Sequence, residues 1–309
     1  MKKVIVLFLI IFITSIAFYY GFSSKPLKSD SKKIQVVTTL FPLYDFAKNI
    51  GQDKVEVTLL LPPGVEPHSF EPKPSDILRI DQSDIFIYTG EFMEPWAGDI
   101  INGITSKEIM VVNSSEGITL INSMFHDDDE PVGSMDPHIW LDFENAKHMI
   151  QNITQSLIER DPDNKDFYVL NSTKYQDELT ALDIKYRDTL SNCQTNEIIY
   201  GGHYAFGYLS KRYDLKYLAA QGVSPDAEPT VQDLVRLVEQ IRKDNIEYIF
   251  YEELSSNKIA ETIAGETNAK MLLLSASHNL SKEDFERGVS FISILNSNLD
   301  NLKKGLQCL

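Results

Sequence analysis

Four of the six histidines stand in short segments that are predicted loops beside strands or helices. His68 lies in GVEPHSFEPKP, residues 64–74, where glycine and proline exclude both a helix interior and a central strand. His138 lies in DPHIWLD, His203 in GGHYAF and His278 in SASHNL. A proline precedes two of these histidines, which stiffens the loop and lowers the entropy cost of presenting the ring to a ligand. Because imidazole is the commonest metal ligand of proteins, the chemistry indicated is metal binding.

The other two histidines have less informative surroundings. His148 falls in a helical pattern, ENAKHMIQNI, so we expect a surface or packing role. His126 precedes the acidic run 127–130, where a solvated loop is the expectation and weak capture of cations is the alternative.

Apolar segments of strand length alternate with amphipathic segments along the chain. This alternation is typical of parallel sheets covered by helices on both faces, so the predicted class is α/β. In such sheets, ligands bind beyond the carboxyl ends of the strands. Because three of the four histidines follow predicted strands, we expect all four to converge on one ion between two lobes. The strands are predicted at residues 34–39, 55–61, 84–90, 108–114, 197–202, 215–220, 246–253 and 269–275.

A long helix is predicted between the two sets of strands. No glycine or proline occurs from Asn164 to about Leu190, Asp161 could cap the helix, and Pro162 would occupy its first position. A helix of this length spans about 40 Å, which suits a connection between lobes. Apolar side chains recur through it at helical spacing: Leu170, Tyr175, Leu179, Leu182 and Tyr186.

The predicted organisation is two α/β lobes with mainly parallel sheets, joined by one long backbone helix. The segments are residues 1–22 (signal peptide or membrane anchor), 23–33 (polar tether), 34–160 (N-terminal metal-binding lobe), 161–192 (linker helix) and 193–309 (C-terminal metal-binding lobe).

The N-terminus has the pattern of an export signal. Lys2 and Lys3 precede an apolar run, residues 4–20, without a clear cleavage site, so both a cleaved signal peptide and a retained anchor stay open. Either outcome places the protein outside the cytoplasm, in a periplasm or tethered to the outer face of the membrane. The net charge of −16 excludes nucleic acid as a partner and suits a cationic ligand or plain solubility. We expect a monomer.

The two cysteines of the chain are Cys193 and Cys308. An oxidising compartment favours a disulfide between them, and two free buried thiols are the alternative.

The chain has four longer motifs, three of which contain His68, His138 or His203: LLPPGVEPHSFEPKPSD, MDPHIWLD, GGHYAFGYLSKRY and FYEELSSNKIAETIAGETNAKMLLL. They resemble the metal-binding subunits of ABC importers, the ZnuA/TroA-like zinc and manganese solute-binding proteins. The resemblance implies two α/β lobes joined by a long helix, with a metal at their interface. It also implies delivery of that metal to a membrane permease that a separate ATPase drives, and it supports the pairing of the two cysteines.

The resemblance also implies the ligands. His68, His138 and His203 match three ligand positions of the family, whereas His278 stands where many relatives have a carboxylate. Glu253, Glu252 or a water are the alternatives for this fourth position. Release is expected when the two ligands of each lobe separate, with little hinge motion because the connecting helix is long and rigid.

Nitrogen ligands favour tetrahedral Zn²⁺ over Mn²⁺, and in this family manganese binders have carboxylates at two of the four positions. Zinc is therefore the predicted cargo, and manganese is the alternative.

Two other classes of protein would require different sequence features. A zinc hydrolase would need an open coordination position and a base; HExxH is absent, and Glu66 and Glu71 beside His68 are expected to be solvated. An adhesin with a role in cell adhesion would not require the histidines to converge. No ATP-binding GxxxxGK[ST] motif is present.

Overall fold

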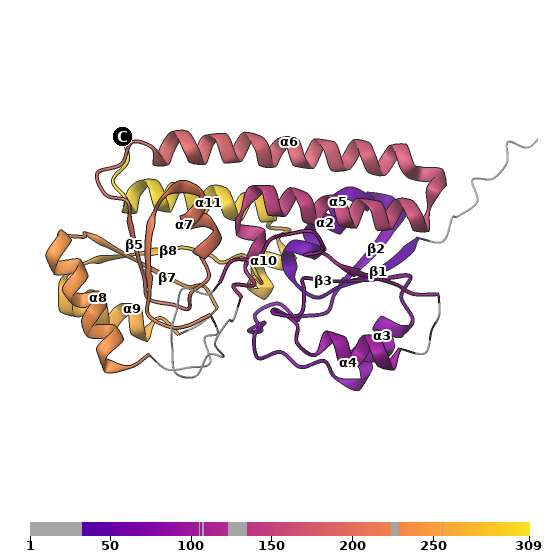
Figure 1. Ribbon diagram of the computed structural model, residues 1–309, viewed down its shortest axis with the longest axis horizontal. Coiled ribbons are helices and arrows are strands. Elements are labelled where there is room, and N and C mark those ends of the chain that lie inside the picture. Colours follow the sequence, from indigo (N-terminus) through magenta and orange to yellow (C-terminus); the bar gives the residue numbers. More distant parts are fainter. Residues whose placement is uncertain (1–32, 105, 107, 123–134, 224–228, 255) are drawn as a thin grey trace, which may run out of the picture. The chain divides into compact units, whose positions relative to one another are not determined.

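Two parallel sheets of four strands each organise the chain, as the computed structural model shows (Figure 1). The structure describes residues 33–104, 106, 108–122, 135–223, 229–254 and 256–309. The predicted signal or anchor segment, the tether before Lys33, and His126 with its acidic run lie outside these ranges. Among the residues described, no helix is long and apolar enough to span a membrane.

The first sheet belongs to the first lobe and has the order β2-β1-β3-β4, with every neighbouring pair parallel. Its register places Ile34 opposite Val55 and Ile85 opposite Met110. The strands are β1 (Ile34–Thr38), β2 (Val55–Leu59), β3 (Ile85–Tyr88) and β4 (Met110–Asn113).

The second sheet belongs to the second lobe and repeats this arrangement in the order β6-β5-β7-β8, again with parallel pairs only. The side chains of its central strands are mostly apolar and buried, because helices pack on both faces of a parallel sheet. The predicted α/β class with two lobes is confirmed. The strands are β5 (Glu197–Tyr200), β6 (Lys216–Ala219), β7 (Tyr248–Tyr251) and β8 (Lys270–Leu273).

Helices form the connections between strands, as the alternation of strand-length and amphipathic segments predicts. The last helical stretch, residues 282–305, is divided in two, because Gly288 adopts a left-handed φ of +73° and ends the first helix. The helices are α2 (Phe41–Gly51), α3 (Pro74–Asp81), α4 (Ala97–Gly103), α5 (Phe143–Arg160), α6 (Lys165–Leu190), α7 (Gly207–Tyr213), α8 (Val231–Asp244), α9 (Lys258–Thr267), α10 (Lys282–Glu286) and α11 (Phe291–Gly305), with short 3₁₀ turns η1 (Gln52–Lys54), η2 (Ile139–Leu141) and η3 (Pro162–Asn164).

The long helix α6 has 26 residues and packs against α2, α5 and α11 (Figure 1). Its tyrosines reach both lobes: the Tyr175 hydroxyl donates to Asp45 Oδ2 on α2 (2.6 Å), and the Tyr186 hydroxyl donates to the Leu295 carbonyl on α11. The predicted cap was wrong in detail. Asp161 precedes η3 rather than α6, and its carboxylate accepts from the Asn164 amide and the Tyr168 hydroxyl instead of a backbone N–H.

Arg212 on α7 connects three elements. Its guanidinium lies 2.6 Å from the Asp183 carboxylate on α6 and 3.2 Å from that of Asp142, which caps the N-terminus of α5. The Tyr213 hydroxyl also donates to Asp183 (2.7 Å). Burial alone would raise the pKa of Asp183, but the hydrogen bonds from Arg212 and Tyr213 outweigh it and lower that pKa. This network holds the second lobe against α5 and α6.

The Cys193–Cys308 disulfide joins the end of α11 to the segment between α6 and β5, and confirms the predicted pairing. Antiparallel backbone bonds flank it, including Gln194 N–H to the Gln307 carbonyl (3.3 Å). The cross-link closes a loop with a sequence separation of 115 residues, which restricts the unfolded chain.

We expect Arg212→Gln to lower the free energy of unfolding by about 1–2 kcal/mol at neutral pH, after allowance for solvent screening. Because the folded-state pKa of Asp183 is lowered, its contribution is present above the ordinary value of 3.8 and is lost as the pH falls through the lowered value. In urea unfolding, the difference in free energy of unfolding between the wild type and Arg212→Gln should therefore be the same at pH 7 and pH 5. It should disappear only below pH 3.8. Arg236→Gln, in the exposed pair with Asp233, is the control. Convergence already at pH 5 would contradict the assignment.

We expect the double variant Cys193→Ser, Cys308→Ser to lose about 2–5 kcal/mol of unfolding free energy, because its unfolded chain regains the entropy that the cross-link removes. Urea unfolding of the wild type with a thiol reductant should match the double variant. A double variant as stable as the oxidised wild type would refute a stabilising role.

Candidate metal centre

The four histidines of the predicted site enter it from four loops. His68 lies in the loop between β2 and α3, and His138 stands directly before η2. His203 follows β5 and His278 follows β8 in the second lobe. Two glycines, Gly201 and Gly202, precede His203. A Cβ added at Gly201 would lie 2.6 Å from the Ala260 side chain of α9, and one added at Gly202 would lie 2.8 Å from the Glu252 carboxylate.

Three of the imidazoles meet at their Nε2 atoms. His138 Nε2 lies 3.3 Å from His68 Nε2 and 3.1 Å from His203 Nε2. These separations match the edge of a tetrahedron with bonds of 2.0–2.1 Å, about 3.3 Å, which is the geometry of Zn²⁺ with nitrogen ligands. The ring centroid of His278 lies 5.7 Å from that of His203. Potential ligand atoms within 4.8 Å of one another form two overlapping groups: His68, His138 and His203; and His203, Glu252 and His278.

Two buried carboxylates contact the far nitrogens of the rings. Asp136 Oδ1 lies 2.8 Å from His138 Nδ1 and accepts the backbone N–H of His138 (2.9 Å). Glu252 Oε1 lies 2.7 Å from His203 Nδ1. With Nδ1–H facing a carboxylate, Nε2 presents its lone pair to the other rings, an arrangement common around protein-bound metals. Asp136 was not predicted as a site residue. Its position two residues before His138 was the only signal for it in the sequence.

Burial sets the protonation of the site. Desolvation and the neighbouring rings hold the pKa values of His68 and His138 well below the usual range, and burial lowers that of His278 to about 3. For His203, burial acts in the same direction, but the Glu252, Glu66 and Glu253 carboxylates together raise its pKa. Three neutral rings therefore offer free lone pairs, the form that binds metal ions.

His278 is the ring with the clearest need of a ligand. It is fully buried, and neither of its ring nitrogens has a hydrogen-bond partner among the described residues. Glu66 Oε2 lies 4.0 Å from its Nε2, beyond hydrogen-bond distance. A buried polar group without a partner costs about 1–3 kcal/mol, so the position favours a bound ion.

The two carboxylates that are alternatives for the fourth ligand lie in different surroundings. Glu252 belongs to the second group of potential ligand atoms, whereas the Glu253 carboxylate accepts from the Ser275 hydroxyl and belongs to neither group. Burial raises the pKa of Glu253 to about 8. Glu253 is thus the weaker candidate of the two.

His148 lies apart from the cluster. It stands on α5, partly exposed, with Nε2 2.8 Å from the Glu116 carbonyl. The predicted surface or packing role agrees with this position. Beside His68, Glu66 Oε1 accepts the backbone N–H of His68 (3.2 Å), and Glu71 is exposed.

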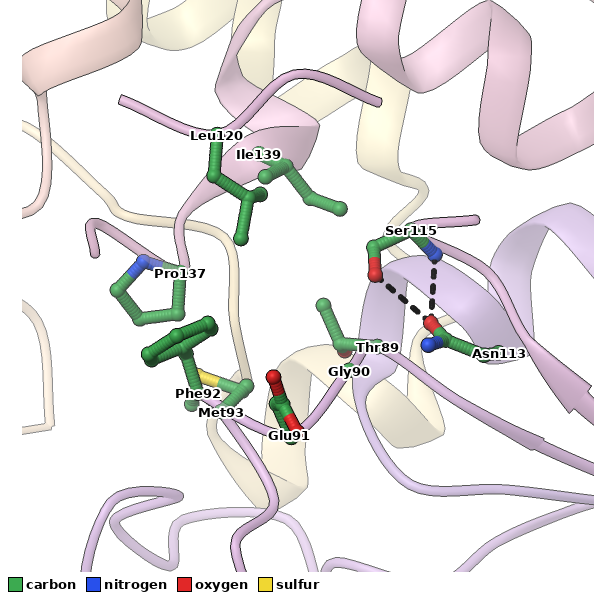
Figure 2. A pocket seen from close by; sticks show the side chains of 10 residues that line it. All are labelled: Thr89, Gly90, Glu91, Phe92, Met93, Asn113, Ser115, Leu120, Pro137 and Ile139. Carbon is green, nitrogen blue, oxygen red and sulfur yellow. Dashed lines mark hydrogen bonds between the residues drawn. The ribbon is translucent and has the colours of Figure 1, made fainter. Parts of the chain in front are cut away.

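A cavity of about 200 Å³ lies next to the metal centre but is not lined by any of the four histidines. In Figure 2, Pro137 and Ile139, which flank His138, lie on one side together with Phe92 and Leu120. Asn113 and Ser115 lie opposite, joined by hydrogen bonds of 2.7 and 3.0 Å. This cavity is thus separate from the place where the imidazole nitrogens meet at distances that suit one ion.

Known proteins resemble nearly the whole described region. A family model, ZnuA, the periplasmic component A of a zinc-uptake complex, matches residues 36–305. The high-affinity zinc uptake system protein ZnuA of Bacillus subtilis is 39% identical over 295 residues, covering 93% of this chain and 92% of that protein. The zinc-binding lipoprotein AdcA of Streptococcus pneumoniae is 32% identical over 284 residues, covering 90% of this chain but only 56% of AdcA. The crystal structure of the Zn(II)-bound ZnuA-like domain of that AdcA matches with a TM-score of 0.77 at 33% identity, covering 89% of this chain and 99% of the domain.

We expect Glu252→Gln to weaken binding of Zn²⁺ about 10–100-fold, because the amide retains the volume but loses the charge that orients the His203 ring. Competition with a chromogenic chelator measures the affinity. Glu253→Gln, the adjacent residue turned toward Ser275, should remain near the wild type. Equal losses in the two variants would indicate a general effect of charge rather than a contact with His203.

Proposed function

The chain belongs to the ZnuA family, and from that premise we propose that it captures Zn²⁺ outside the cytoplasm and delivers it to an ABC importer. The observation that carries this proposal is the meeting of three imidazoles, two of them fully buried, with Nε2 atoms 3.1–3.3 Å apart. The proposed ligands are His68, His138, His203 and His278, with Asp136 and Glu252 orienting two of the rings.

Zinc is favoured over manganese by the nature of the donors. All four proposed ligands are nitrogens, which suit Zn²⁺, whereas Mn²⁺ prefers carboxylate and other oxygen ligands. Among the described residues, the carboxylate grouped with these nitrogens is Glu252, whose Oε1 is already 2.7 Å from His203 Nδ1. Manganese would have to draw Glu252 away from His203, so the cargo of the proposed importer is zinc.

A transport role is favoured over hydrolysis. A catalytic zinc site keeps one coordination position open for water, whereas a fourth histidine would close this one. The two relatives described above are named for zinc uptake and zinc binding, not for a reaction. We therefore propose that the protein is not an enzyme, and purified protein with bound zinc should release no product from peptide or ester substrates.

Location and partners follow from the same role. An uptake component works outside the cytoplasmic membrane, and residues 1–22 would serve as its signal or anchor, with residues 23–33 as a tether. The proposed partner is a permease driven by a separate ATPase. The lobes that hold the ion would be residues 34–160 and 193–309, with 161–192 as the linker.

We expect His203→Ala to weaken Zn²⁺ binding by at least about 100-fold, because one of four nitrogen ligands is lost and the Glu252 carboxylate is left without its ring. His148→Ala, on α5 and outside the cluster, is the matched control and should bind as the wild type does. Elemental analysis of protein purified without added metal should find one zinc per chain. An affinity of His203→Ala near that of the wild type would refute the site.

The fourth ligand is tested by a second pair of variants in the same assay. His278→Ala should reduce zinc affinity strongly. If it has no effect while Glu252→Ala or Glu253→Ala does, a carboxylate occupies the fourth position and the proposed assignment of His278 fails.

A further inference from the structure

The loop that carries His278 changes partners along its length. Up to Ser275 it is held within the second lobe, where the Leu274 N–H donates to the Tyr251 carbonyl (3.0 Å) and the Ser275 N–H to Asn298 Oδ1 (2.9 Å). Beyond Ser275, Ser277 still bonds back to Ser275 (3.1 Å), but the residues on either side of Ser277 bond to the first lobe. By its place in the sequence, His278 belongs to the second lobe. The hydrogen bonds of its loop nevertheless attach it to the first lobe.

Five hydrogen bonds join this part of the loop, residues 276–280, to the first lobe. Three use backbone or indole N–H groups of the first lobe, and two use the side-chain amide of Asn279. They are Phe41 N to His278 O (3.2 Å), Gly64 N to Leu280 O (2.9 Å), Trp140 Nε1 to Ala276 O (2.8 Å), Asn279 Nδ2 to Pro62 O (2.9 Å) and Asn279 Nδ2 to Val65 O (2.8 Å).

Asn279 is the centre of this attachment. It is fully buried, its Nδ2 gives both protons to carbonyls of the loop that carries His68, and its Oδ1 accepts the Leu280 N–H (2.9 Å). The adjacent Ser277 adopts a left-handed φ of +60°, which an L-residue adopts rarely and which the surrounding bonds hold in place. One side chain thus fixes the His68 loop to the residue beside His278.

The segment of His203 is held differently. Among the described residues, its backbone bonds run within the second lobe: Gly201 N–H donates to the Phe250 carbonyl (2.8 Å), Tyr204 N–H to the Gly222 carbonyl (2.7 Å), and the His203 carbonyl accepts from the Tyr217 hydroxyl (3.1 Å).

Apart from the contact of the His203 ring with His138 (3.1 Å), the bonds from this part of the described chain to the first lobe begin at α7. There the Tyr208 hydroxyl donates to the Asp136 carbonyl (3.1 Å), and Arg212 binds Asp142. A displacement of the His203 loop would therefore not have to break these bonds.

We infer that Asn279 is a positioning residue that makes His68, His138 and His278 one fixed set of zinc ligands, from which His203 is the ligand that separates. The inference rests on the proposed function and deepens it. The ligands then divide three and one, rather than two from each lobe as the sequence suggested. The ion would leave by losing His203 first.

The test compares Asn279→Ala and Asn279→Asp with the wild type. Asn279→Asp keeps the shape but replaces the donor with an oxygen facing two carbonyls, so both variants should lose zinc affinity about 10–100-fold and release zinc to a chelator faster. In double-mutant cycles the loss should largely vanish when His278 is already alanine and persist when His203 is alanine. The control is Asn298→Ala, a buried asparagine with two bonds to Ser275 inside the second lobe. Asn279→Asp with the affinity of the wild type would overturn the inference.

Amide hydrogen exchange of the full chain provides a readout that does not depend on zinc. In metal-free wild type, the Phe41 and Gly64 amides should be protected to the same degree as in the zinc-loaded protein, and Asn279→Ala should expose Gly64. Rapid exchange of these amides in metal-free wild type would overturn the fixed set. A wild type that binds no zinc but keeps them protected would refute the proposed function and leave the attachment of the loop standing.

Discussion

The whole arrangement depends on one constraint: the nitrogens of buried imidazole rings must find partners other than water. His138, His203 and His278 are fully buried, and burial disfavours their protonated forms. Asp136 and Glu252 contact one nitrogen each of two rings, and the Nε2 atoms of those rings lie 3.1 Å apart. Such a cluster is costly without an ion and favourable with one, so its stability is tied to occupancy.

Keeping these rings within a few ångströms requires that the two sheets do not drift apart. Helix α6 bonds to α2 through Tyr175 and to α11 through Tyr186, while Arg212 ties α7 to both α5 and α6. The disulfide holds the end of α11 to the start of the second lobe. With so many connections, a wide opening of the protein would break several bonds at once, whereas a shift of one loop breaks few.

The strands and the long helix were predictable because their signals are local: apolar runs, helical spacing and the absence of glycine and proline. The ends of elements were less so. The strand expected at 246–253 is confined to Tyr248–Tyr251, because Glu252 leaves the sheet toward His203. Convergence of the histidines was expected from the rule for strand ends and from the family resemblance. The pairing of Glu252 with His203 and the bonds of Asn279 to the His68 loop join residues far apart in the chain, and no local pattern encodes them.

The equal strand order of the two sheets leads to one more point. By position in that order, β1 corresponds to β5 and β2 to β6. The histidine loops do not correspond, since His68 comes after an edge strand and His203 after an inner one. A duplicated framework thus holds an unsymmetrical donor set. Neither half taken alone would contain a complete site, and a protein assembled from two copies of the same half would reproduce the framework without the metal centre.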